Sequence, residues 1–214
     1  MRVMEERKSI GRDVLRASAL ALTFVVIAAL PAEAHHVMGG RTPSTLTEGF
    51  LSGLGHPVFG LDHLAFIVAM GLVAGLAGLN LVIPASFIIA SAAGVAVHMR
   101  GGTLPGAEIM VALSVLIAGA MIALGRSMQG WIWAALFIVA GFVHGYAFGE
   151  SIFGAEASPL AAYLLGLVMV QVVIATVVAL IARRSSAAAT EPRLAGAAIA
   201  GIGIAILAGQ FIPA

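Results

Sequence analysis

The sequence predicts an all-α membrane protein, a bundle of six transmembrane helices that follows an N-terminal cleavable signal peptide. Three observations lead to this fold class. Of the 214 residues, 61% are hydrophobic and only 10% are charged, whereas a soluble domain carries about a quarter charged residues. The N-terminus has the three-part pattern of a signal peptide, and six long apolar segments follow it. We therefore expect a signal peptide over residues 1–34 and one membrane domain over residues 35–214.

The N-terminal segment divides into charged, apolar and cleavage regions. Five basic residues precede or border the apolar run 17–30, which is too short to span comfortably, since ~1.5 Å per residue gives about 21 Å against a core of about 30 Å. Ala32-Glu33-Ala34 then supplies an A-x-A cleavage signal. The alternative is an uncleaved anchor helix. With cleavage after Ala34, the mature chain begins with His35 and His36 on the periplasmic side of a bacterial inner membrane, where they could collect a metal ion.

Six apolar segments follow, and glycine, proline or charge marks most of the junctions between them. The expected spans cover residues 58–77, 79–98, 107–125, 130–148, 159–182 and 194–212. Short connections favour antiparallel neighbours in a compact bundle. The 26 glycines are typical of membrane helices that approach one another closely through small residues.

Basic residues set the expected orientation of these spans. With the mature N-terminus outside, the inner loops hold one acid, Glu191, and the arginines Arg126, Arg183, Arg184 and Arg193. The outer segments hold Arg41 and Arg100 together with the acids Glu48, Glu108, Glu150 and Glu156. This distribution follows the positive-inside rule, and it agrees with export by the signal peptide.

Composition also excludes several functions. The chain has no cysteine, so disulfides, iron–sulfur clusters and thiolate metal sites are excluded. The net charge of +1 gives no reason to expect a nucleic-acid partner. No Walker loop is present, which argues against direct coupling to ATP, and no G-x-S-G surrounds Ser114, which argues against an intramembrane serine protease. We expect no enzyme.

The ionisable residues of the spans gather at the outer end. His56, Asp62 and His63 stand at the start of the first span, and His144 and Glu150 stand at the outer end of the fourth. Ionisable residues within spans are costly and usually mark a pathway or a binding site, so we predict a metal site made by these five. His98 and Met70 are accessory candidates for the site. Each also has a simpler structural interpretation, a cross-helix hydrogen bond for His98 and core packing for Met70.

Spacing constrains which of these residues can share an ion. His56 and His63 are seven residues apart, so a straight helix would place them on one face but ~10 Å apart in rise. Either the chain breaks near Gly60, or His56 belongs to a separate outer site above His63. His144 and Glu150 are six apart, so a shared ion requires the helix to open near Gly149.

The ligand set is imidazole plus carboxylate, which suits nickel, cobalt, zinc, manganese or iron(II). Asp62 either binds the ion directly or accepts a hydrogen bond from a ligating imidazole. Two other functions stay open on these residues. His63 and His144 could ligate one haem axially in an electron-transfer subunit, or the chain could be a metal-binding accessory protein that transports nothing.

Two segments resemble motifs of the HupE/UreJ family of nickel permeases, which are encoded with hydrogenase and urease systems. HPVFGLDH matches that family's H-x5-DH pattern at His56, Asp62 and His63. HGYAFGE matches its F-H-G-x-A pattern in part: Val143 replaces the Phe before His144, and Phe148 stands where some members have another His. The last residue of this segment, Glu150, falls one position earlier than the acid of the family motif.

This resemblance implies an inner-membrane permease that takes up nickel, or next cobalt, from the periplasm without ATP. The ion is then a transported substrate, and no permanently bound cofactor is expected. The expected partners are the divalent ion and the lipid bilayer, with no nucleic acid, and the layout is compatible with a homo-oligomer.

Overall fold

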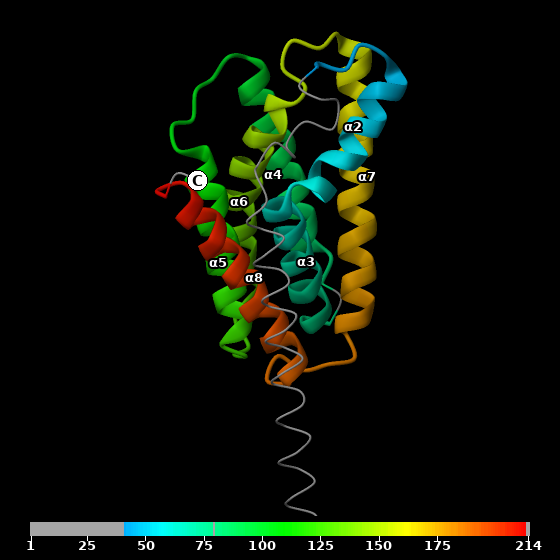
Figure 1. Ribbon diagram of the computed structural model, residues 1–214. Coiled ribbons are helices and arrows are strands. Elements are labelled where there is room, and N and C mark those ends of the chain that lie inside the picture. Colours follow the sequence, from blue (N-terminus) through cyan, green and yellow to red (C-terminus); the bar gives the residue numbers. More distant parts are fainter. Residues whose placement is uncertain (1–40, 79, 213–214) are drawn as a thin grey trace, which may run out of the picture.

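The computed structural model describes residues 41–78 and 80–212, and this part of the chain is all-helical, as predicted. Figure 1 shows the helices as one bundle. They are α2 (Leu46–Phe59), α3 (Leu61–Leu76), α4 (Val82–Met99), α5 (Ala107–Ala123), α6 (Gly130–Glu150), α7 (Ala157–Ala182) and α8 (Thr190–Gly209). The predicted signal peptide, with His35 and His36 after it, lies outside the described residues.

The six predicted spans correspond to α3 through α8, and the protein is a multi-pass membrane protein. By length and composition, α4, α6, α7 and α8 can each cross a membrane. Helices α2 and α3 pass the same test together, as a pair bent by 79°. Helix α5 is apolar but shorter, with 17 residues. The exact number of six complete spans therefore stays a prediction, and α2 is an element that the hydropathy pattern missed.

The bend between α2 and α3 has a local cause. Helix α2 starts with a capping box, in which Thr45 accepts a hydrogen bond from the Glu48 amide and the Glu48 carboxylate accepts one from the Thr45 amide. Pro57 lies in its last turn, and Gly60 is extended, with φ −75° and ψ 105°. A new helix starts at once, and Asp62 in its first turn places a negative charge at the positive end of the α3 dipole.

Helix pairs pack through glycines. The most extensive contacts join α4 to α6, α5 to α8 and α2 to α7, and α3 lies against α7. At Gly145 on α6, a β-carbon would stand only 2.0 Å from the Ser91 carbonyl oxygen on α4. Gly119 on α5 faces the backbone of Ala200 on α8 in the same way. The expectation of close approach through small residues is confirmed, and it follows because backbones can approach closely only where the side chain is a hydrogen.

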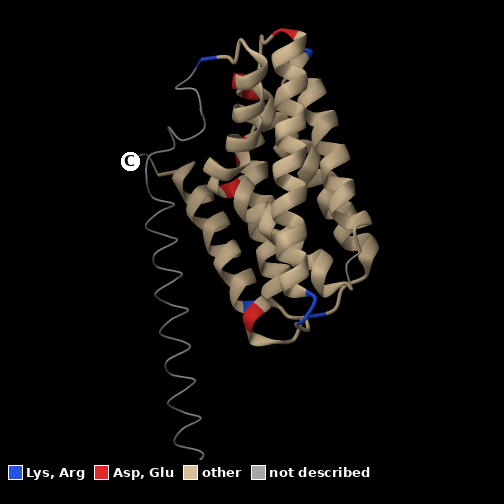
Figure 2. Ribbon diagram, turned by 90° about the vertical axis from the view of Figure 1, so that its right-hand side faces the viewer, with Lys and Arg blue, Asp and Glu red and all other residues tan. Residues whose placement is uncertain are grey.

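The charged connections separate by end. The α5–α6 and α7–α8 connections lie at one end of the bundle, where Figure 2 shows most of the blue backbone, and the α4–α5 and α6–α7 connections lie at the other. The first end carries Arg126, Arg183, Arg184 and Arg193, and the second carries Glu150 and Glu156. This is the separation that the sequence predicts, and which end faces the cytoplasm stays a prediction.

Candidate metal site

Three histidines from three helices meet in the half of the bundle nearer to its acidic end. His56 comes from the last turn of α2, His63 from the first turn of α3, and His144 from α6. The ring centroids of His56 and His63 are 5.4 Å apart, and those of His63 and His144 are 5.0 Å apart. The break at Gly60 makes this possible, because it removes the ~10 Å rise that a straight helix would put between the first two rings.

Burial increases from the first ring to the last. The exposed fraction is 4% for His56, 2% for His63 and 0% for His144. Aromatic side chains form the walls: the Phe148 ring lies 4.4 Å from His63 and the Phe66 ring 4.8 Å from His144, centroid to centroid. Apolar walls of this kind strengthen every electrostatic interaction inside them.

Hydrogen bonds fix the tautomers of two of the rings. Ser114 Oγ donates its one proton to the Val111 carbonyl at 2.7 Å and lies 2.9 Å from Nε2 of His144. Because a hydroxyl has a single proton, His144 Nε2–H must donate to Ser114. Nδ1 of His144 then carries a lone pair, and Nδ1–H of His63 donates to it across 2.9 Å.

Asp62 lies beside the other nitrogen of His63. Its Oδ1 accepts a hydrogen bond from the His63 amide at 2.8 Å and stands 3.9 Å from His63 Nε2. The Asp62 side chain is 13% exposed. Ser114 therefore holds the outer nitrogen of His144, and the Asp62 carboxylate lies near the outer nitrogen of His63 without a hydrogen bond to it.

A second chain of hydrogen bonds holds His56. Nδ1 of His56 is 2.8 Å from Ser151 Oγ, and Ser151 donates to the Tyr163 hydroxyl at 3.1 Å. Tyr163 in turn donates to the Phe148 carbonyl at 2.7 Å. When every donor in this chain is used, His56 Nδ1–H donates to Ser151, and Nε2 of His56 carries the lone pair.

Three hydroxyl residues of the site, Ser114, Ser151 and Tyr163, were not predicted from the sequence as part of it. Ser151 directly follows the HGYAFGE segment, and that adjacency is the one sequence signal that pointed to it. Ser114 was considered only as a protease nucleophile. Tyr163 lies 107 residues from His56, and nothing in the spacing connects them.

Three predicted residues lie outside the group of rings. Helix α6 continues without opening at Gly149, and Glu150 is exposed at its last position, whereas His144 is fully buried. His98 packs against Tyr146, with ring centroids 4.6 Å apart, in a separate place on α4. Met70 is fully buried in the main apolar cluster, as its packing interpretation expects.

The described part of the chain has no group of three or more His, Asp or Glu side chains that could hold a metal ion as they stand. What the structure does bring together is a pair of imidazoles with a carboxylate and a third imidazole near it. The haem alternative fits this pair poorly. Two axial nitrogens with iron between them are separated by about twice a metal–nitrogen bond of ~2 Å, and the Nδ1 atoms are 2.9 Å apart and bonded to each other.

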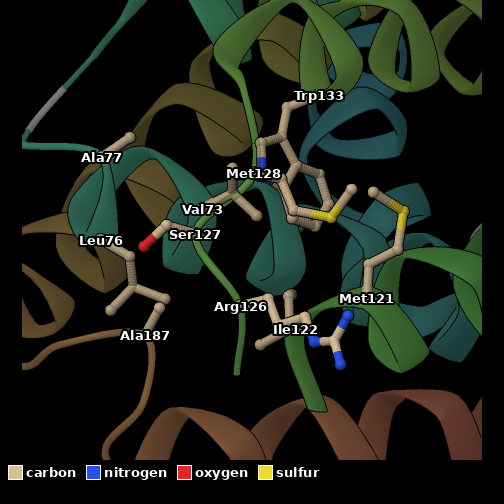
Figure 3. A pocket seen from close by; sticks show the side chains of 10 residues that line it. All are labelled: Val73, Leu76, Ala77, Met121, Ile122, Arg126, Ser127, Met128, Trp133 and Ala187. Carbon is tan, nitrogen blue, oxygen red and sulfur yellow. The ribbon is translucent and has the colours of Figure 1, made fainter. Parts of the chain in front are cut away.

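A cavity lies at the opposite, basic end of α3. Its volume is about 150 Å³, and α3, α5, α6 and three connections form its walls. Figure 3 shows the thioethers of Met121 and Met128 beside the ring of Trp133 in this cavity. Helix α3 therefore has His63 at one end and this cavity at the other.

Comparison with known proteins agrees with the motif resemblance. The profile of the family described as HupE / UreJ protein matches residues 22–206. The chain is also 30% identical over 191 residues to the protein named HupE from Rhizobium leguminosarum bv. viciae, an alignment that covers 87% of this chain and 96% of that protein. No solved structure matches.

Proposed function

The chain belongs to the HupE/UreJ family, and from this premise we propose that it is a permease for a divalent transition-metal ion, nickel first and cobalt next. The family consists of permeases and accessory proteins, not enzymes. In this proposal the protein lies in the bacterial inner membrane, with the three histidines facing the periplasm, and the ion enters the bundle through them.

One observation carries the proposal, the separation of 2.9 Å between the Nδ1 atoms of His63 and His144. With metal–nitrogen bonds of about 2.05 Å, two nitrogens at a right angle are about 2.9 Å apart, and two nitrogens at a tetrahedral angle are about 3.3 Å apart. Right angles are those of square-planar and octahedral ions. The separation is therefore close to that of two nitrogens bound to one divalent transition-metal ion.

In the proposed bound state, the ion takes the place of the proton that links the two rings. His63 then carries its proton on Nε2, next to the Asp62 carboxylate, while His144 keeps its Nε2–H on Ser114. Both rings stay neutral, since one proton only changes nitrogen. Asp62 supplies negative charge against the ion and fixes the orientation of the His63 ring.

His56 is the proposed first contact for an arriving ion, because its ring is the most exposed of the three. Water molecules complete the coordination around the two deeper imidazoles. A site with two protein nitrogens suits transport, because an ion must bind well enough to enter and weakly enough to leave.

The test is nickel uptake by cells that lack their own nickel transporters. We expect His63→Gln and His144→Gln to lower the uptake rate at least about 10-fold, which corresponds to the loss of about 1.4 kcal/mol of binding. His98→Gln is the matched control, since it removes an imidazole outside the pair, and its uptake should equal that of the wild type. Unchanged uptake in both pair variants, at equal protein levels in the membrane, would overturn the proposal.

The same experiment separates a permease from an accessory protein. If the protein only binds metal, the purified wild-type protein will bind nickel, but the cells that express it will take up no nickel. An absorption spectrum of the purified protein without a Soret band would dispose of the haem alternative.

A further inference from the structure

Gln171 is a buried amide without partners. Its side chain is fully buried in the middle of α7, and neither its amide nitrogen nor its carbonyl oxygen has a hydrogen-bond partner within residues 41–212. The one other described residue with such an atom is His98, whose side chain is partly exposed. An amide without hydrogen bonds is costly in an apolar environment, and leucine or methionine would fill the same space without that cost.

The position of Gln171 along α7 places it on the face that leads down from the histidines. Tyr163, Leu167 and Gln171 follow one another at intervals of four, so they share one side of the helix, and all three are buried. The hydroxyl of Tyr163 belongs to the chain of hydrogen bonds that holds His56.

The register between α3 and α7 gives the depth of Gln171. A β-carbon at Gly71 would meet the Ala175 carbonyl, and one at Gly75 would meet the Ala179 carbonyl. The two helices therefore run in the same direction with a constant offset, and Figure 1 shows them side by side. This offset puts Gln171 level with Ile67, one helical turn, or ~6 Å, below His63.

Gln171 also separates two apolar clusters. Leu167, one turn above it, belongs to the outer cluster with Phe148 and Tyr163. Ala175, one turn below it, belongs to the large inner cluster with Met70. The amide thus lies where the two apolar clusters adjoin, one helical turn beneath His63.

We propose that Gln171 is a second binding station for the transported ion, below the pair formed by His63 and His144. Its carbonyl oxygen binds the divalent transition-metal ion, and its amide nitrogen donates to water that stays with the ion. Neutral oxygen binds late transition metals less strongly than imidazole does, so the ion moves onward from this station. The inference rests on the proposed function, and it explains why an amide occupies this place.

The test compares uptake with binding in Gln171→Leu, a change that replaces the amide by an apolar side chain of similar volume. We expect the maximal rate of nickel uptake to fall at least 10-fold while the apparent KM stays within about twofold of the wild type. Nickel binding to the purified variant should stay unchanged, because the outer imidazoles are intact. The thermal unfolding temperature should stay equal or rise, because an unpaired amide is lost.

Met169→Leu is the matched control, since Met169 is exposed on the same helix, and its uptake should equal that of the wild type. Wild-type uptake in Gln171→Leu would overturn the inference, and so would a parallel loss of uptake, binding and thermal stability, which indicates a packing role. His63→Gln distinguishes the two proposals. If it abolishes uptake while Gln171→Leu does not, only the second station is wrong; if it has no effect, the proposed function fails first.

Discussion

At the scale of single residues, the site depends on which ring nitrogens of the histidines carry protons, and this follows from the number of protons that the neighbouring hydroxyl groups can donate. Ser114 has one proton and gives it to the Val111 carbonyl, so every other hydrogen bond in the His144–His63 pair has a definite direction. Residues outside the motif thus decide which nitrogens carry lone pairs. Groups that orient a metal-binding imidazole in this way are worth about 10–100-fold in metal affinity.

Ser114→Ala removes the acceptor for His144 Nε2–H. We expect nickel affinity to fall about 10-fold or more, measured by competition with a chelator. Ser91→Ala is the matched control, because Ser91 is also buried and donates to the carbonyl three residues back on its own helix. Equal affinities in the two variants would show that Ser114 does not orient the ring.

Asp62→Asn separates the structural role of Asp62 from its charge. The asparagine carbonyl can still accept the hydrogen bond from the His63 amide, so thermal stability should change little. Nickel affinity should fall, because the carboxylate charge that balances the ion is lost. A variant that binds nickel as tightly as the wild type would show that the charge of Asp62 contributes nothing to binding.

The sequence predicted the imidazoles of the site but not the hydroxyl residues that hold them. Histidine within an apolar span is rare enough to be noticed. Serine in a helix usually bonds its own preceding turn, as Ser114 does, and the Ser151 hydroxyl also lies within 3.2 Å of the Phe148 carbonyl oxygen. Their second contacts depend on how helices pack, and no spacing in the chain encodes that.

At the scale of elements, the break at Gly60 brings His56 and His63 together. A β-carbon at Gly60 would stand 2.7 Å from Cδ2 of the His63 ring. We expect Gly60→Ala to displace that ring and to lower nickel uptake more than it lowers the amount of folded protein in the membrane. A variant with wild-type uptake would show that the ring position is not critical.

Gly145→Ala tests the packing of α6 on α4. The new β-carbon would stand 2.0 Å from the Ser91 carbonyl oxygen, and overpacking of this kind typically costs about 1–3 kcal/mol of stability. Gly201→Ala is the matched control, since a β-carbon at this helical glycine meets nothing within 4 Å. The thermal unfolding temperature should fall in the first variant and not in the second, and equal temperatures would contradict the packing.

The helices themselves were largely predictable, because long apolar segments leave few alternatives. Helix α2 was missed although Thr45 and Glu48 carry a capping-box signature. The segment after them contains serine, glycine and histidine, so the apolar pattern begins only near residue 58. The alternative that placed a break near Gly60 was nevertheless among the expectations from spacing, and the structure confirms it.

At the scale of the whole molecule, uptake of an ion from the periplasm requires a fixed orientation of the bundle. His63 lies in the first turn of α3, and the cavity lies at the last turn of the same helix, with Arg126 in its wall. The chain has no cysteine, so single cysteines can report sidedness without background. A membrane-impermeant maleimide should label Thr103→Cys in intact spheroplasts and Ser127→Cys only after lysis. The reverse pattern would show that the bundle is inverted.

The central claim is that His63 and His144 bind one transition-metal ion between them. X-ray absorption spectroscopy of the nickel-loaded, purified protein tests it most directly. We predict a four- or six-coordinate nickel whose spectrum contains imidazole ligands, and loss of the imidazole contribution in the variant that combines His63→Gln with His144→Gln. A wild-type spectrum without imidazole, or an identical spectrum in the double variant, would contradict the account.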